Sequence, residues 1–195
     1  MRVILAEKPS VGREIAQALG GFVKSPTNRF LTNQKDCIIT WAIGHLIELH
    51  HPTVNDIAKL PILPNDDEWQ LRVINADGYQ EQFDVIKKLF DSPQVKEVVN
   101  ACDAGREGEL IFRLVYEMTG CRKPVLRLWI SSMEDSAIRE GFSDLRPGAD
   151  YEALYQSALC RQKADWLVGI NATRLFSVLY HRTLNVGRVQ TPTLA

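Results

Sequence analysis

The sequence lacks several features that would assign it to a class at once. Its four cysteines lie far apart and form no Cys-x-x-Cys pair, so reduced cytosolic thiols are the simplest interpretation and we expect a cytoplasmic protein. There is no long apolar run and no basic-then-apolar leader, which argues against membrane insertion and secretion. The 195 residues suit one full domain plus part of another.

An excess of either charge is also missing. The chain has 23 lysines and arginines against 24 aspartates and glutamates, a net charge of -1. The total therefore gives no indication of a nucleic-acid partner, although the distribution of charge can. Residues 153–195 carry five cations against one carboxylate, a local net charge of +4. This end of the chain is where an anionic partner would be attracted.

Strand and helix patterns alternate along most of the chain. The apolar run at residues 3–6 predicts a buried strand, and Ser10 predicts the N-cap of a helix that stops at Gly20-Gly21. This alternation predicts an α/β fold with a parallel sheet flanked by helices. Further patterns predict strands at residues 37–43, 69–74, 95–101 and 125–130 and helices at 79–90, through 110–115 and at 133–142. Residues 51–68 predict a proline-rich surface excursion.

The pattern changes after Pro147-Gly148. Residues 151–180 form a nearly unbroken helical pattern without proline. We therefore predict a first domain at residues 1–148 and the beginning of a mainly helical second domain at 149–195. Because the closing residues NVGRVQTPTLA stop in mid-pattern, we expect the chain to be part of a longer protein.

Acidic residues follow two of the predicted strands. Glu7 comes directly after the first strand, and Asp103 and Glu107 follow the strand that ends near residue 101. In an open parallel sheet, ligands bind outside the carboxyl ends of the strands, so neighbouring strands would bring Glu7 and Asp103 face to face. Carboxylate oxygens, completed by water and substrate phosphate, suit Mg²⁺. Lys8 and Arg106 would add the positive charge that a phosphate-handling site needs.

Each acidic segment also has an ordinary structural explanation. Glu7 could be a solvated cap at the end of a strand. The DAGREGE segment could be a turn whose acids favour the N-terminal dipole of the next helix. Gly105 and Gly108 flank charges at that turn, where the backbone could approach a phosphate or a metal closely. Taken together, the two segments favour a metal site over two separate structural roles.

Four motifs occur in order along the chain: EKPSVGREIAQAL, DAGREGELIFR, RQKADWLVGINATR and GRVQTPTLA. In this order they resemble the bacterial type IA DNA topoisomerases of the topoisomerase III kind, and the resemblance covers the whole chain. It implies a Rossmann-like TOPRIM domain followed by the start of a helical DNA-binding body. It also implies an enzyme that cuts one DNA strand through a 5′-phosphotyrosine, passes another strand through the gap and reseals the break with Mg²⁺ and without ATP.

The resemblance implies roles for residues at the acidic edge. Glu7 would bind Mg²⁺ or manage the proton on the leaving 3′-oxygen, and Lys8 would hold the scissile phosphate. Asp103 and Glu107 would be the further metal ligands. One departure is present, because Gly105 stands where the Asp-x-Asp pattern of the family has its second aspartate. Either Glu107 or water then replaces the missing ligand, or the metal binds more weakly.

The resemblance further implies a path for single-stranded DNA along the last predicted helix and the residues after it. The residues alone allow a plainer explanation, a solvated helix face with an i,i+4 ion pair between Arg161 and Asp165. The four tryptophans could stack bases, but each lies in an apolar pattern, so we expect core packing for Trp41, Trp69, Trp129 and Trp166. His45 could order the site near Glu7 or serve only structurally. The expected contacts to the phosphate backbone are Arg161, Asn171, Arg174, Arg188, Gln190 and Thr191.

None of the five tyrosines lies in a sequence like the active-site motif of the family, so we expect the nucleophile elsewhere in the longer protein and an inactive isolated piece. Two other classes stay open, a TOPRIM nuclease or primase and a non-catalytic module that binds single-stranded DNA. The segments GINATR and GRVQTPT argue against the first, and the retained acid cluster argues against the second. The resemblance makes DNA the partner, leaves room for a helicase partner, and is compatible with a monomer located at the nucleoid.

Overall fold

The computed structural model describes residues 1–52, 57–65 and 68–194, and the chain divides into two compact units. The first unit comprises residues 1–48 and 72–158, and the second comprises residues 49–71 and 159–195. The domain boundary predicted near residue 148 stays a prediction. Part of the predicted surface excursion, residues 53–56 and 66–67, lies outside the described residues.

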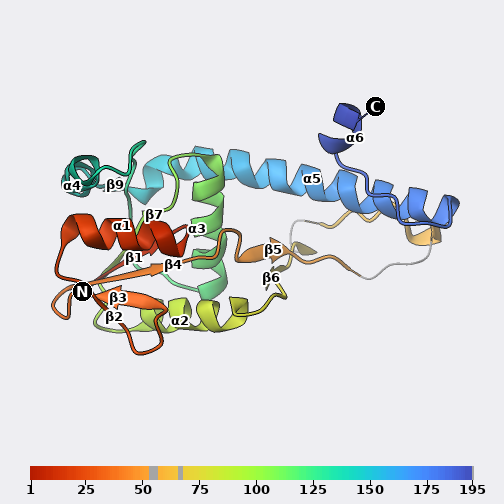
Figure 1. The fold of residues 1–195 in the computed structure, drawn as a ribbon. Helices are drawn as coiled ribbons and strands as arrows, with labels where there is room; N and C mark the ends of the chain where they lie inside the picture. Colours follow the sequence, from red (N-terminus) through yellow and green to blue (C-terminus); the bar gives the residue numbers. More distant parts are fainter. Residues whose placement is uncertain (53–56, 66–67, 195) are drawn as a thin grey trace. The chain divides into compact units, whose positions relative to one another are not determined.

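The first unit is built on a seven-stranded sheet in the order β2-β3-β4-β1-β7-β8-β9 (Figure 1). The four strands in its middle are parallel, as the sequence pattern predicts: β4 (Cys37–Trp41), β1 (Arg2–Ala6), β7 (Glu97–Ala101) and β8 (Val125–Arg127). Short antiparallel strands complete both edges: β2 (Val23–Lys24), β3 (Phe30–Thr32) and β9 (Arg146–Pro147).

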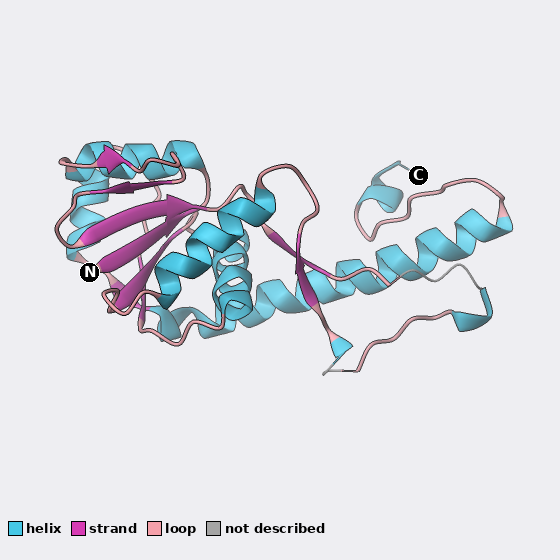
Figure 2. Cartoon of the chain, turned by 90° about the horizontal axis from the view of Figure 1, so that it is seen from below, coloured by secondary structure: helices cyan, strands magenta, loops and turns pink. Residues whose placement is uncertain are grey.

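Helices cover both faces of this sheet (Figures 1 and 2). Helices α1 (Pro9–Leu19) and α4 (Asp135–Ser143) contact each other on one face. Helices α2 (Tyr79–Asp91) and α3 (Arg106–Thr119) contact each other on the opposite face. Because α1 leads from β1 to β4 and α3 leads from β7 to β8, the chain turns in opposite directions on either side of the β1–β7 pair. Such a reversal point is where open α/β sheets bind their ligands.

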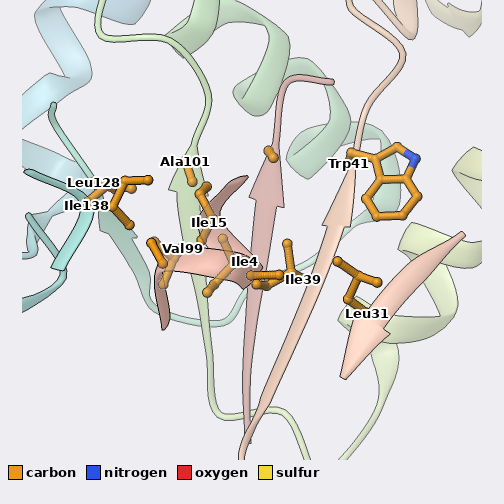
Figure 3. Close-up of a cluster of buried hydrophobic side chains, with 12 residues drawn as sticks. Ile4, Ile15, Leu31, Ile39, Trp41, Val99, Ala101, Leu128 and Ile138 are labelled. Atoms are coloured by element: carbon orange, nitrogen blue, oxygen red, sulfur yellow. The ribbon is translucent and has the colours of Figure 1, made fainter. Parts of the chain in front are cut away.

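The core beneath α1 and α4 fixes the register of the central strands. Ile4, Ile39 and Val99 lie on three neighbouring strands and point to the same face, where Ile15 of α1 and Ile138 of α4 cover them (Figure 3). All five side chains are buried. A shift of one residue along β1 would turn its apolar set away from these helices, so the burial determines where β1 ends.

The start of α1 differs from the sequence prediction. The N-cap is Lys8, in an extended conformation and without a side-chain cap, and the helix begins at Pro9. The prediction that Ser10 caps the helix is therefore wrong. Proline suits the first helical position because its missing N–H has no partner there anyway, so the helix starts directly behind the strand tip.

The second unit contains most of a long helix, α5 (Glu152–Leu179), which confirms the helical pattern predicted for residues 151–180. Trp166 and Ile170 of this helix are buried against Leu49, and Trp69 packs beside them. The remaining elements are η1 (Ile57–Lys59), α6 (Gln190–Leu194), the β5 (Ile47–Leu49) and β6 (Leu71–Val73) pair, and η3 (Gly148–Tyr151) of the first unit. No helix in the described ranges is both long and apolar enough to span a bilayer.

Candidate active site

Two acidic residues meet at the carboxyl edge of the sheet. Strands β1 and β7 are direct neighbours in parallel register, with Ala6 opposite Ala101. Glu7 leaves the end of β1, and Asp103 follows β7 by two residues. The backbone N–H of Asp103 donates to the Glu7 Oε2 carboxylate oxygen at 3.4 Å. The structure thus confirms that these two strands are neighbours, which the predicted site requires.

Glu7 and Lys8 face different surroundings although they are adjacent. The Glu7 side chain is nearly buried, while the Lys8 ammonium is exposed and lies 3.8 Å from Glu7 Oε1. A cavity of about 360 Å³ opens beside Lys8 and is also lined by Arg13, Ser10 and Gly44. Two cations and a hydroxyl at one opening can receive a phosphate group next to a carboxylate.

The donor set at this edge suits a hard divalent cation. Glu7 and Asp103 supply carboxylate oxygens, and Mg²⁺ characteristically takes one or two carboxylates with waters and substrate phosphates. The Oε2 carboxylate oxygen of Glu107 lies 3.6 Å from the Nε2 atom of His45. Within the described residues, no group of three or more His, Cys, Asp or Glu side chains could hold a metal ion, so Glu107 is not grouped with Glu7 and Asp103 in a ready-made site. An ion at this edge would therefore depend on water and phosphate for much of its coordination.

The two glycines of the DAGREGE turn have different functions. A Cβ added at Gly108 would lie 2.2 Å from the Asp103 carbonyl oxygen, so only glycine lets the first turn of α3 pack on the Asp103 backbone. A Cβ added at Gly105 would meet no atom within 4 Å, and Gly105 has extended φ and ψ angles that any residue adopts. The position that lacks the expected aspartate therefore has room for one.

A buried ion pair, which the sequence analysis did not find, lies beneath the acidic edge. Glu109 is 1% exposed and Arg127 is fully buried, and Arg127 Nε lies 3.2 Å from Glu109 Oε2. Asn100 Nδ2 donates to the same carboxylate at 2.8 Å, and Arg113 Nε donates to it at 2.9 Å. The signal was present, because Asn100 and Arg127 each follow a pair of apolar residues within a strand.

The Arg127 guanidinium holds the backbone that carries Asp103. Its Nη1 donates to the carbonyl oxygen of Cys102 at 2.7 Å, and its Nη2 donates to the carbonyl oxygen of Asp103 at 2.5 Å. Burial lowers the pKa of Arg127, while the Cys102 thiol and the Glu109 carboxylate beside it act in the opposite direction. Burial also raises the pKa of the Cys102 thiol, which keeps this sulfur protonated at neutral pH.

The residues predicted to contact DNA are distributed along the second unit. Asp165 pairs with Arg161 at 3.7 Å, which confirms the predicted i,i+4 pair, and also with Arg188 at 2.7 Å. A cavity of about 350 Å³ along α5 is lined by Asp165, Gly169, Thr173 and Arg174, among others. Of the predicted DNA contacts, Arg174 lines this cavity, whereas Arg161 and Arg188 have exposed side chains that pair with Asp165.

Three other predicted DNA contacts have partners within the second unit. Asn171 donates to the Ile62 carbonyl oxygen at 3.0 Å and accepts from its N–H at 2.6 Å. Arg174 donates to the Pro52 carbonyl oxygen. Thr191 accepts from the Gly187 N–H at 3.0 Å and, like Gln190, lies in α6. These bonds give the three side chains structural functions, and their contact with DNA stays a prediction.

Comparisons with known proteins agree with this geometry. A family model described as Toprim domain matches residues 2–133, and one described as DNA topoisomerase matches residues 149–195. DNA topoisomerase 3 of Bacillus subtilis (strain 168) is 46% identical over 200 residues, which cover 99% of this chain and 26% of that protein. DNA topoisomerase 3 of Staphylococcus epidermidis is 44% identical over 199 residues, which cover 98% of this chain and 27% of that protein.

The chain spans about a quarter of the length of these relatives. Among solved structures, full-length topoisomerase I from Thermotoga maritima has a TM-score of 0.64 at 22% identity, over 98% of this chain and 29% of that chain. This likeness shows a shared fold. The chain belongs to the Toprim domain family, and both of these relatives, which it matches along nearly its whole length, are named DNA topoisomerase 3.

Proposed function

We propose that this chain supplies the acidic site and part of the single-strand path of a type IA DNA topoisomerase. The observation that carries the proposal is the meeting of Glu7 and Asp103 at the reversal point of the sheet, with Lys8 beside them. The relatives are named DNA topoisomerase 3, and DNA is accordingly the proposed substrate.

Mg²⁺ is the proposed cofactor, with Glu7, Asp103 and Glu107 as the residues that would hold it. A divalent ion supplies charge neutralisation at a phosphate and a template for its oxygens. Lys8 would hold a non-bridging oxygen of the scissile phosphate, because its exposed ammonium borders the cavity that Arg13 also lines. Glu107 would need to exchange its contact with His45 for the ion.

The proposed cleavage step conserves the phosphodiester. A tyrosine oxygen bonds to phosphorus, the bond from phosphorus to the 3′-oxygen breaks, and the 3′-oxygen takes a proton. Glu7, when it is protonated and not bound to the ion, would deliver this proton, and the proton of the tyrosine hydroxyl leaves to solvent. Resealing reverses each bond change, so no ATP is consumed.

The nucleophile is proposed to lie outside these 195 residues. Tyr79 donates its hydroxyl to the Ile43 carbonyl oxygen, Tyr116 to that of Lys123, and Tyr155 to the Glu117 carboxylate. Burial is the largest of the causes that raise the pKa values of Tyr116 and Tyr155, which makes both hydroxyls poorer nucleophiles. Tyr151 and Tyr180 stack on Trp129 and Phe176.

The remaining parts of the proposal concern the surroundings of the enzyme. Single-stranded DNA would follow α5 toward α6, through the six residues named for this path. We further propose a monomer located at the nucleoid, with a helicase as the partner that exposes single strands. The positive charge of residues 153–195 supports the DNA path.

The first test uses the chain itself with an oligonucleotide labelled at either end, with and without Mg²⁺. After denaturation we expect intact DNA in every lane, with binding detected separately. Free cleaved DNA that requires Mg²⁺ and Asp103 would replace the proposal by a TOPRIM nuclease. A covalent adduct would identify one of the five tyrosines as the nucleophile.

The second test restores a complete enzyme by exchanging the matching 200 residues of the Bacillus subtilis relative for this chain. We expect the chimera to relax supercoiled plasmid, and Glu7→Gln to slow relaxation by about 100-fold or more. Glu14→Gln, the same change at an exposed position of α1, is the matched control and should act like the parent. Normal turnover by the folded Glu7→Gln chimera would contradict the assignment.

A further inference from the structure

Trp129 departs from the packing that its sequence context predicts. It follows β8 by two residues in an apolar stretch, yet its side chain is 40% exposed. The prediction of core packing is therefore wrong for this tryptophan, whereas Trp41 and Trp166 are buried. Within the described residues, the Trp129 indole N–H has no hydrogen-bond partner, so both its ring and its donor remain available.

An aromatic partner and a cation support the Trp129 ring. The Tyr151 ring stacks on it with centroids 5.0 Å apart and an interplanar angle of 23°. The Arg127 guanidinium carbon lies 5.0 Å from the Trp129 centroid and 5.9 Å from the Tyr151 centroid. The Arg127 guanidinium thus lies close to both rings, so the guanidinium and the two stacked rings form one cluster. The exposed part of the ring is thus the part that these neighbours do not cover.

The support is rigid because Arg127 cannot move independently. Its guanidinium is fully buried and donates to the carbonyl oxygens of Asn100, Cys102 and Asp103. A preorganised ring loses little freedom when a flat ligand stacks on it. The same guanidinium links the Trp129 ring to the Asp103 backbone, so the exposed aromatic surface lies one side chain away from the acidic edge.

We propose that Trp129, supported by Tyr151, is a stacking platform for one nucleobase of the DNA strand whose phosphate lies at the acidic edge. This inference rests on the proposed function, which supplies the single-stranded DNA. Stacking on an indole uses the π-face that every base has, so the platform would bind a base without selecting its identity. It would fix the position of the strand next to Glu7 and Asp103, while the phosphate contacts supply most of the affinity.

The experiment compares oligothymidylate with a strand of equal length that has no bases. Affinities of the folded chain for both strands are measured by fluorescence anisotropy at one fixed salt concentration. We expect the parent to bind oligothymidylate about tenfold more tightly. Trp129→Leu should lose most of this preference while keeping its affinity for the abasic strand, and Trp129→Phe should retain most of it. Tyr180→Leu, which removes another exposed aromatic ring, is the matched control and should keep the preference.

Each other outcome has a defined meaning. An unchanged preference in Trp129→Leu would overturn the platform and leave the proposed function intact. An equal loss of affinity for both strands, together with a lower melting temperature, would assign Trp129 a structural role and also overturn the platform. If the parent binds neither strand, the proposed DNA path itself fails. A preference for one base over the others in the parent would overturn the claim that the platform does not select its base.

Discussion

The two units differ in whether the ion pairs at their candidate sites are buried or exposed. In the first unit, the strand ends rest on a fully buried arginine that pairs with Glu109 and donates to backbone carbonyls. In the second unit, Arg161 and Arg188 pair with Asp165 at the surface, where more than two fifths of each side chain is exposed. The buried pair fixes a backbone, whereas the exposed pairs leave their charges within reach of a ligand.

This difference separates two tasks that one DNA-cleaving site must combine. Chemistry at Glu7 and Asp103 needs carboxylates held in place, and a buried charge network provides rigid support because each missing partner is costly. Holding a DNA strand needs cations that can exchange a carboxylate for a phosphate, and exposed ion pairs are weak enough to do so. Substitutions in the buried network should therefore change the free energy of unfolding, whereas substitutions in the exposed pairs should change the affinity for DNA.

The largest effect is expected from Arg127→Met. This change removes one of the two arginines that pair with buried Glu109 and releases the Cys102 and Asp103 carbonyls. We expect the free energy of unfolding in urea to fall by about 3–5 kcal/mol. Arg146→Met, which removes an exposed arginine that pairs with Asp144, is the control and should cost less than about 1 kcal/mol. Similar losses for both variants would remove the contrast between buried and exposed charge.

The next effect is expected from Gly108→Ala. The added Cβ would overlap the Asp103 carbonyl oxygen, so the first turn of α3 must shift. We expect a loss of about 1–3 kcal/mol in unfolding free energy, although alanine is the better helix former. Gly105→Ala is the matched control, because its Cβ meets no neighbour, and it should leave the stability unchanged or slightly raised. Equal stabilities of the two variants would show that α3 does not pack closely on Asp103.

A smaller effect, on metal affinity alone, is expected from Gly105→Asp. The position has an extended backbone and open space, so an aspartate fits without strain. It would add a carboxylate to Glu7, Asp103 and Glu107 at the acidic edge, and added ligand charge strengthens divalent-ion binding, here by about tenfold. Titration calorimetry with Mg²⁺ measures this, with Gly105→Asn as the uncharged control of similar size. Unchanged affinity would mean that this turn does not face the ion.

The sequence was informative where a periodic pattern and a local motif coincide. Strand β1 and helix α1 could be predicted because an apolar run and an amphipathic stripe are local features. The sequence analysis could only assume that β1 pairs with β7, because neither segment contains a feature that identifies its neighbouring strand. The structure supplied that pairing, and with it the approach of Asp103 to Glu7.

The buried pair of Glu109 and Arg127 was not predicted, for a different reason. A charged residue in an apolar strand indicates a partner, but Arg127 finds its partner Glu109 on a helix where the nearby acid Glu107 is exposed. The two glutamates are separated by one residue, and only the helix phase distinguishes them. Trp129 was assigned wrongly because its apolar neighbour Leu128 is buried and it is not. Such alternation becomes visible only when the strand and its two faces are known.

The smallest effect is expected from Asp165→Asn, which raises the net charge of residues 153–195 from +4 to +5. Because Asp165 contacts both Arg161 and Arg188 at the surface, its removal should leave thermal stability nearly unchanged. Affinity for single-stranded DNA should rise by roughly two- to fivefold at low salt, and the gain should vanish at high salt because the added attraction is screened. Glu140→Gln makes the same change in charge at an exposed position of α4, and a path confined to the second unit predicts a smaller gain there. An equal gain from both variants would indicate that DNA responds to the total charge of the chain, and the contrast between the two units would then not extend to binding.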